Sequence, residues 1–191
     1  MQAYALALDI VRGCWLAFVA VWLLAAVSTK RTVYRESHSQ RLRYWVLFVI
    51  ACLLLIYGRQ LPYPLNLNVI PHAVPIAWTA VILCIAGLLV ALWARVILGR
   101  NWSGMVTLKE GHELVERGPY RVVRHPIYTG YLISHVAFAA AHPTTWNIGV
   151  IVVSDVALVV RALLEERVLI QDERYRVYCA RVGWHLMPGV F

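Results

Sequence analysis

Two polar clusters interrupt this apolar chain and hold the residue types that can bind a charged ligand. In the first cluster, Arg124 and His125 stand directly before Pro126. A proline fits the first turn of a helix because its missing N–H group costs no hydrogen bond there. His125 therefore lies at a predicted helix start, where free N–H groups and the helix dipole favour anions. Arg124 adds a positive charge, which makes this helix start a candidate carboxylate or phosphate site. In the structural alternative, His125 caps the helix within a basic cluster at a membrane boundary.

The second cluster contains Arg161, Glu165 and Glu166. Arg161 and Glu165 are four residues apart, so they share one face of a helix. Glu165 and Glu166 are adjacent and point about 100° apart on a helix. At most one of the two carboxylates therefore faces the same target as Arg161. The structural alternative is a solvated charged face at the point where a helix leaves a membrane.

The composition indicates that membrane-spanning helices position these clusters. Of the 191 residues, 61% are hydrophobic and 15% are charged. Soluble domains contain about 45–50% apolar residues and about 25% charged residues. The mean hydropathy of +0.64 also indicates a membrane protein. We therefore predict an all-α integral membrane protein, folded as a single domain over residues 1–191.

Five apolar segments approach the ~20 residues that one bilayer span needs. These predicted transmembrane helices are Leu6–Ser28, Tyr44–Gly58, Ile76–Ala94, Ile127–Ala141 and Trp146–Leu164. The first segment lacks a cleavage-site pattern and is interpreted as a retained helix. Asp155 lies inside the fifth segment and should face protein or water rather than lipid, because an ionisable group at that depth is costly.

The last two predicted helices form a hairpin that brings the polar clusters together. A hairpin returns its second helix to the membrane face where its first helix began. Arg161 and Glu165 should therefore approach the Arg124–His125 pair. Residues 1–98 then hold the first three helices, and residues 99–191 form the half that carries the chemistry.

The basic residues lie on one predicted side of the membrane. Sixteen of the eighteen Lys and Arg residues fall within residues 30–43, 95–124 and 161–181. Because Lys and Arg collect on the cytoplasmic side, we predict an N-terminus outside and a cytoplasmic C-terminus and active site. The uncharged connections Gln60–Pro75 and Ala141–Asn147 suit the opposite side. This asymmetry explains the net charge of +8 without nucleic acid as a partner.

The C-terminal stretch Arg167–Arg181 has the spacing of an amphipathic helix. Its apolar positions, with one just beyond it, are Val168, Leu169, Ile170, Tyr175, Tyr178 and Val182. We predict an interfacial helix on the cytoplasmic surface that can cover the site.

Several common motifs are absent from the sequence. There is no GxGxxG, P-loop, HExxH, GxSxG or CxxC motif, and no His, Cys or carboxylate spacing that indicates a zinc or other metal site. The four cysteines are interpreted as small apolar residues rather than disulfide partners.

The polar half of the chain resembles the isoprenylcysteine carboxyl methyltransferase family, in particular its short five-helix prokaryotic form. The motifs that carry the resemblance are Asn101–Trp102–Ser103, Gly111–Val115, Gly118–Tyr120, Arg124–Tyr128, Arg161 with Glu165–Glu166, Tyr175, Tyr178 and Pro188–Gly189. They cover about residues 100–191. An RHPxY sequence followed one hairpin later by two glutamates is a specific combination, whereas RHP alone is not.

The resemblance implies that S-adenosylmethionine binds in a cytoplasmic pocket over the end of the hairpin and leaves as S-adenosylhomocysteine. The matching cofactor-binding positions are His112, Glu113, Leu114, Val115, Tyr120, Arg124, His125, Pro126, Ile127, Tyr128, Glu165 and Glu166. Arg161 matches the position implicated in substrate binding and is the predicted catalytic residue. The implied reaction is methyl transfer to the carboxylate of a lipid-modified (isoprenyl) cysteine or a similar membrane-borne acceptor.

Three other functions remain open at this point. The chain could be a membrane methyltransferase that acts on a phospholipid amine or a small thiol. It could also be a sterol-type reductase that uses NADPH, because such membrane enzymes have a similar C-terminal ending. The third alternative is a non-catalytic membrane scaffold, which leaves the convergence of the two polar clusters unexplained.

Overall fold

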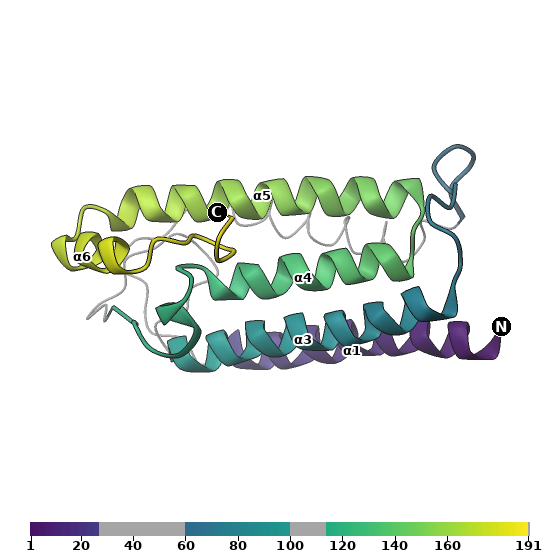
Figure 1. The fold of residues 1–191 in the computed structure, drawn as a ribbon, viewed down its shortest axis with the longest axis horizontal. Helices are drawn as coiled ribbons and strands as arrows, with labels where there is room; N and C mark the ends of the chain where they lie inside the picture. Colours follow the sequence, from purple (N-terminus) through teal and green to yellow (C-terminus); the bar gives the residue numbers. More distant parts are fainter. Residues whose placement is uncertain (27–59, 100–113, 191) are drawn as a thin grey trace.

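The computed structural model describes residues 1–26, 60–99 and 114–190 (Figure 1). Its helices are α1 (Gln2–Ala26), α3 (Val74–Leu98), the 3₁₀ helix η3 (Gly118–Arg121), α4 (Pro126–Ala141), α5 (Thr145–Leu169) and α6 (Glu173–Arg181). The four long helices run along a common axis, with α1 beside α3, α4 next to α3, and α5 on the far side of α4 (Figure 1). The described residues form no β-strand, so the predicted all-α class is confirmed for them.

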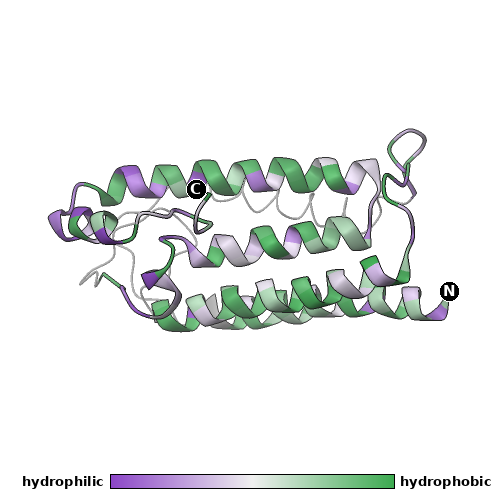
Figure 2. Ribbon diagram, viewed as in Figure 1, coloured by the Kyte–Doolittle hydropathy of each residue, from purple (hydrophilic) through white to green (hydrophobic). Residues whose placement is uncertain are grey.

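Among the described residues, three helices are long and apolar enough to cross a membrane, namely Gln2–Leu24 within α1, α3 and α5. Figure 2 shows apolar residues along these helices and polar residues gathered at one end of the bundle, around α6 and the segment before α4. α4 has 16 residues. At the rise of an α-helix this is about 24 Å, which is less than the ~30 Å hydrocarbon core of a bilayer. The predicted span Tyr44–Gly58 lies outside the described residues, so the number of spans stays a prediction.

Glycines let α3 and α4 pack backbone against backbone. A Cβ atom added at Gly87 would lie 2.6 Å from the carbonyl oxygen of Gly130, and one added at Gly130 would lie 2.7 Å from the backbone nitrogen of Ala91. The Ser134 hydroxyl lies at the same contact, 2.8 Å from the carbonyl oxygen of Gly130 on its own helix and 3.3 Å from that of Cys84 on α3. Small residues permit such close helix packing in membranes. This contact holds the first half of α4 against the middle of α3.

An aromatic row connects α1 to α4 and continues into a polar contact with α5. Trp15 stacks on His135 with ring centroids 5.4 Å apart, and Trp22 contacts Tyr131 at 5.7 Å. His135 Nδ1 lies 2.5 Å from Asp155 Oδ1, which joins the two helices of the hairpin. The prediction that Asp155 faces protein is confirmed.

The uncharged connection before α3 packs against the turn between α4 and α5. The backbone N–H groups of Thr145 and Trp146 donate to the carbonyl oxygens of Leu67 and Leu65 at 2.9 and 3.0 Å, and Val69 N–H donates to the carbonyl oxygen of Pro143 at 2.7 Å. The two uncharged connections therefore lie at one end of the bundle, together with the N-terminus (Figure 1).

The predicted helix over Arg167–Arg181 is wrong in its extent. α5 takes the first three residues of this stretch, and α6 holds only the last nine. Asp172 separates the two helices because its side chain accepts a hydrogen bond from the backbone N–H of Arg174 at 2.9 Å, as an N-cap residue does. The chain turns there, so that α6 lies beside the end of α5 (Figure 1) and buries Tyr175 and Tyr178.

Candidate active site

The hairpin brings the two predicted polar clusters into contact at the end of the bundle opposite the N-terminus (Figure 1). The Tyr128 hydroxyl on α4 donates to Glu165 Oε1 on α5 at 2.8 Å. Arg161 Nε donates to the same oxygen at 3.0 Å. The predicted approach of the second cluster to the first is therefore confirmed.

The neighbouring carboxylate, Glu166, faces a different set of donors. Its Oε2 accepts from Arg124 Nη1 at 2.9 Å. Its Oε1 lies 2.9 Å from His125 Nε2 and 2.8 Å from His185 Nδ1. An ionised carboxylate only accepts hydrogen bonds, so both imidazoles donate to it. The two glutamates therefore diverge as predicted, and we refer to Glu166 with these three donors as the Glu166 network.

His125 occupies the N-cap position of α4, but its side chain makes no capping hydrogen bond. Its ring stacks on Tyr128, with centroids 5.5 Å apart and planes 4° apart. Nε2 faces Glu166, whereas Nδ1 lies 3.8 Å from Glu165 Oε2, which is beyond hydrogen-bonding distance. The alternative in which His125 caps the helix is therefore wrong, and the buried ring instead stands between the two carboxylates.

The Arg124 guanidinium is fully engaged. Nε donates to the carbonyl oxygen of Val182 at 2.7 Å, and Nη2 lies 3.2 Å from that of Cys179 and 3.4 Å from that of Gly183. Together with the bond from Nη1 to Glu166, every guanidinium nitrogen has an acceptor. Arg124 thus ties α6 and the segment after it to the start of α4.

The segment after α6 runs along the start of α4. Arg124 N–H donates to the carbonyl oxygen of Trp184 at 3.0 Å, and His125 N–H donates to that of His185 at 2.9 Å. The Thr129 hydroxyl donates to the carbonyl oxygen of Leu186 at 2.6 Å. Sequence reasoning missed His185, because no spacing relates it to Glu166, which lies 19 residues earlier in the chain.

The apolar and aromatic residues predicted for the cofactor fall into two groups. The group beside the end of α3 contains Val115, Tyr120, Ile127 and Tyr128. In the other group, Leu114 packs against Tyr175 and Tyr178 of α6 and Val182 just after it, three residues that were not among those predicted to bind the cofactor. The Tyr178 hydroxyl joins them by donating to the carbonyl oxygen of Tyr120 at 2.8 Å. Burial raises the pKa of Tyr178 above its usual value, which keeps this hydroxyl protonated.

The structure places the remaining predicted residues as follows. Pro126 is fully buried in the first turn of α4. His112 and Glu113 lie outside the described residues.

Arg161, Glu165 and Tyr128, which we call the Arg161 set, form the part of the site that can receive a charged ligand. The side chains of Arg161 and Glu165 are 38% and 20% exposed, whereas those of Arg124 and Glu166 are 12% exposed. Within the described part of the chain, no donor lies within hydrogen-bonding distance of Glu165 Oε2, so this oxygen can accept from an ammonium group. A guanidinium matches the geometry of a carboxylate. The Arg161 set therefore suits a ligand, or two ligands bound together, that present a carboxylate, an ammonium group and an aromatic ring.

Comparison with known proteins supports the resemblance noted in the sequence. Residues 80–171 match the sequence model of the isoprenylcysteine carboxyl methyltransferase (ICMT) family. Among solved structures, the eukaryotic intramembrane Ras methyltransferase ICMT, without a monobody, has a similar fold, with a TM-score of 0.55 and 19% sequence identity over 81% of this chain. The chain spans 55% of the length of that protein. Comparison with curated proteins found no match. The apolar helices and the shared fold identify a multi-pass integral membrane protein.

Proposed function

Because residues 80–171 match the sequence model of the isoprenylcysteine carboxyl methyltransferase family, we propose that the chain is a member of this family and transfers the methyl group of S-adenosylmethionine to the carboxylate of an isoprenylated cysteine or a similar membrane-borne acceptor. The observation that carries this proposal is the position of the Arg161 set directly beside the largely buried Glu166 network. The network provides a rigid frame, and the Arg161 set provides charges of both signs at the end of membrane-spanning helices.

We propose that Glu165, the start of α4 and the aromatic and apolar residues beside it contact the cofactor. Glu165 Oε2 suits its ammonium group, and Tyr120 and Tyr128 offer aromatic faces to its adenine or sulfonium. The start of α4 with His125 suits its carboxylate, since helix N-termini favour anions. Leu114, Val115, Pro126 and Ile127 complete the apolar wall, with His112 and Glu113 as further candidates.

Arg124 and Glu166, in contrast, are proposed to act as positioning residues. The Arg124 guanidinium would have to give up backbone carbonyl acceptors in order to bind a ligand. Glu166 already accepts from three donors. Their proposed role is to hold His125 and the start of α4 in place, which matters because small misplacements of reacting groups are costly.

When bound, S-adenosylmethionine supplies an electrophilic methyl group. The acceptor carboxylate is ionised at neutral pH, so the reaction needs no general base, and the protein has to align this carboxylate and exclude water from it. Arg161 is proposed to hold the carboxylate through two parallel N–H···O bonds. Glu165 orients the Arg161 side chain by accepting from its Nε.

The proposed site faces the cytoplasm. Arg121 ends η3, Arg124 lies just before α4, and three further arginines lie on α6. α6 and the start of α4 are at one end of the bundle, whereas the uncharged connections and the N-terminus are at the other end (Figures 1 and 2). The bias of Lys and Arg toward the cytoplasmic side supports this orientation.

Calorimetric titration of the purified protein in detergent tests the cofactor. We expect saturable binding of S-adenosylhomocysteine and no binding of NADPH. Binding of NADPH alone would support a reductase instead, and binding of neither ligand by folded protein would support a scaffold.

Methyl transfer assays then test the acceptor, with S-farnesylcysteine compared with a phospholipid amine and a small thiol. A carboxylate acceptor should show little rise in rate with pH near neutrality. An amine has to lose a proton before transfer, so its rate should rise with pH.

A further inference from the structure

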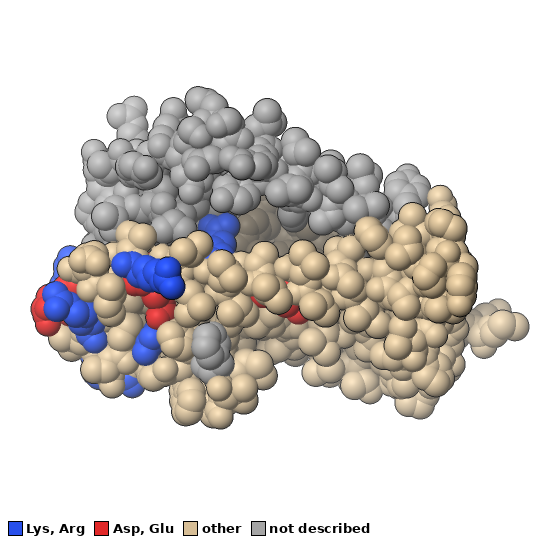
Figure 3. Space-filling model, turned by 90° about the horizontal axis from the view of Figure 1, so that it is seen from above, with Lys and Arg blue, Asp and Glu red and all other residues tan. Residues whose placement is uncertain are grey.

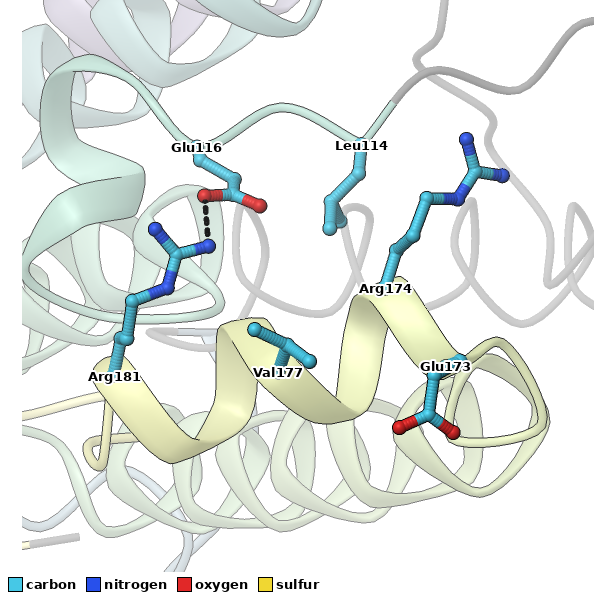
Figure 4. A pocket seen from close by; sticks show the side chains of 6 residues that line it. All are labelled: Leu114, Glu116, Glu173, Arg174, Val177 and Arg181. Atoms are coloured by element: carbon cyan, nitrogen blue, oxygen red, sulfur yellow. Dashed lines mark hydrogen bonds and ion pairs between the residues drawn. The ribbon is translucent and has the colours of Figure 1, made fainter.

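The His135–Asp155 pair lies apart from the other ion pairs of the C-terminal half. Figure 3 shows most of the charged side chains on the face it draws gathered at the end of the molecule that carries α6. The ion pairs there are exposed to water, as that of Arg181 with Glu116 is (Figure 4), and solvent weakens them. Asp155 instead lies about 15 Å along α5 from its start, where an ionisable group is costly in a membrane. The pair takes no part in the proposed ligand contacts, so its presence needs a separate explanation.

Two histidine–carboxylate contacts join α4 to α5 at different depths. His125 Nε2 lies 2.9 Å from Glu166 Oε1 at the site, and His135 Nδ1 lies 2.5 Å from Asp155 Oδ1 within the hairpin. Ten residues separate the two histidines along the chain, and eleven separate the two carboxylates. Because α4 and α5 run in opposite directions, both contacts follow a single register of the hairpin.

The spacing on α5 relates Asp155 to the choice between Glu165 and Glu166. At about 100° per residue, Glu166 lies about 20° around the helix from Asp155, whereas Glu165 lies about 80° away on the other side. When Asp155 faces His135, Glu166 therefore faces α4 as well, and Glu165 is turned aside toward Tyr128. A rotation of α5 by one residue position, about 100°, would place Glu165 where Glu166 now lies.

Apolar packing does little to fix this rotation. The residues of α5 that the structure buries are Asn147, Ile151 and Ala162. Large apolar side chains of this helix, among them Val153 and Val156, are exposed. In a membrane, lipid solvates such side chains as well as protein does, so polar contacts and small residues decide how helices meet.

The imidazole of His135 is held in place from the side of α1. Trp15 stacks on His135 with ring centroids 5.4 Å apart and planes 20° apart, and it also stacks on Tyr131 at 6.5 Å. His135 belongs to α4, which packs backbone against backbone on α3. Asp155 therefore attaches the less tightly packed helix of the hairpin to a ring whose position is set by the other helices.

We propose that His135 and Asp155 are positioning residues of the methyl-transfer site. Their contact fixes the rotation of α5 about its axis, so that the Arg161 set assembles while Glu166 stays in its network. Neither side chain touches a ligand, and both act through α5. The effect of the pair on catalysis rests on the proposed function, whereas its effect on the rotation of α5 does not.

Thermal unfolding without ligand tests the rotation. The double variant H135F/D155L removes both polar partners, and such exchanges are often close to neutral for stability because neither group is left without a partner. In the wild type, Glu166→Ala is expected to lower Tm much more than Glu165→Ala does. In the H135F/D155L background this difference in Tm should shrink by about half or more, because the substitutions are coupled through the rotation of α5. An unchanged difference would overturn the proposal. If H135F/D155L does not fold, Asp155→Ser, which is too short to reach His135, replaces it in the same comparison.

Methyl transfer to S-farnesylcysteine, measured well below Tm, tests the consequence for catalysis. We expect H135F/D155L to lose about tenfold in kcat/KM, whereas Asp155→Asn should stay close to the wild type because its amide oxygen accepts the same hydrogen bond. The matched control is Val156→Leu, a change at the adjacent exposed position, and it should leave kcat/KM unchanged.

A pair with a merely structural role would change Tm and leave kcat/KM of the folded protein intact. Wild-type kcat/KM in H135F/D155L, or an equal loss in Val156→Leu, would therefore contradict the proposal. Absence of methyl transfer by the wild type would contradict the proposed function instead, and the comparison of Tm values would still test the rotation of α5.

Discussion

Replacement of Glu166 by alanine tests whether the Glu166 network acts as a frame rather than as a ligand-binding group. The side chains of Glu166 and Arg124 are each 12% exposed, and Glu166 also accepts from two imidazoles. Removing one partner of a buried ion pair costs about 3–5 kcal/mol, because the remaining charge stays buried without compensation. In a chain of this size, such a loss lowers Tm by roughly 6–20 °C.

The matched control is Glu165→Ala, one residue earlier on the same helix. Its partner Arg161 is 38% exposed, so solvent screens much of the ion pair. The loss of this pair and of the acceptor for the Tyr128 hydroxyl should cost about 1–2 kcal/mol of stability. Because Glu165 is proposed to bind the cofactor's ammonium group, this variant should lose binding of S-adenosylhomocysteine while remaining folded.

Two measurements separate the loss of stability from the loss of ligand affinity. Thermal unfolding without ligand, followed by circular dichroism, gives Tm. Calorimetric titration with S-adenosylhomocysteine, well below Tm, gives the affinity. The reasoning predicts a large fall in Tm for Glu166→Ala and a large fall in affinity for Glu165→Ala. An unchanged Tm in Glu166→Ala would refute the assignment of a framing role to its three hydrogen bonds. Wild-type affinity in Glu165→Ala would refute the assignment of ligand binding to the Arg161 set.

Further substitutions test the other parts of the site and the fold. Arg161→Ala should lower kcat/KM on the order of 100-fold by misaligning the acceptor, while the Kd for S-adenosylhomocysteine stays close to the wild-type value. Equal losses in kcat/KM and in affinity for S-adenosylhomocysteine would contradict the proposed role of Arg161. His125→Ala should weaken S-adenosylhomocysteine binding about tenfold, and unchanged binding by the folded variant would remove His125 from the site. Gly130→Leu should destabilise the protein by about 3 kcal/mol or more, because added atoms would meet the backbone of α3. Gly149→Leu, where no atom lies within 4 Å of an added Cβ, should leave Tm nearly unchanged in the same unfolding assay.

The transmembrane elements were predictable because apolar length is a local property of the chain. The segments predicted at Leu6–Ser28, Ile76–Ala94 and Trp146–Leu164 correspond to α1, α3 and α5, with ends displaced by a few residues. The largest displacement is at the end of α5, which continues through Glu165, Glu166 and Arg167. The apolar run ends at Leu164, but Glu and Arg are good helix formers. The helix therefore continues to Leu169, where the chain turns before Asp172.

Part of the site was also predictable without tertiary structure. The hairpin topology predicted that Arg161 and Glu165 would approach the start of α4, and helical geometry predicted that Glu165 and Glu166 would point to different partners. Both follow from the fixed rise and rotation per residue of a helix.

Which donors meet each carboxylate was decided only by the tertiary structure. The close backbone contact between Gly87 and Gly130 sets the position of α4, and the turn at Asp172 directs the chain back along the start of α4. These non-local contacts bring His185 to Glu166 and saturate Arg124, leaving the Arg161 set more exposed. Side-chain types and spacing describe one helix at a time, whereas the pairing of side chains between helices depends on packing distances and on the path of the chain.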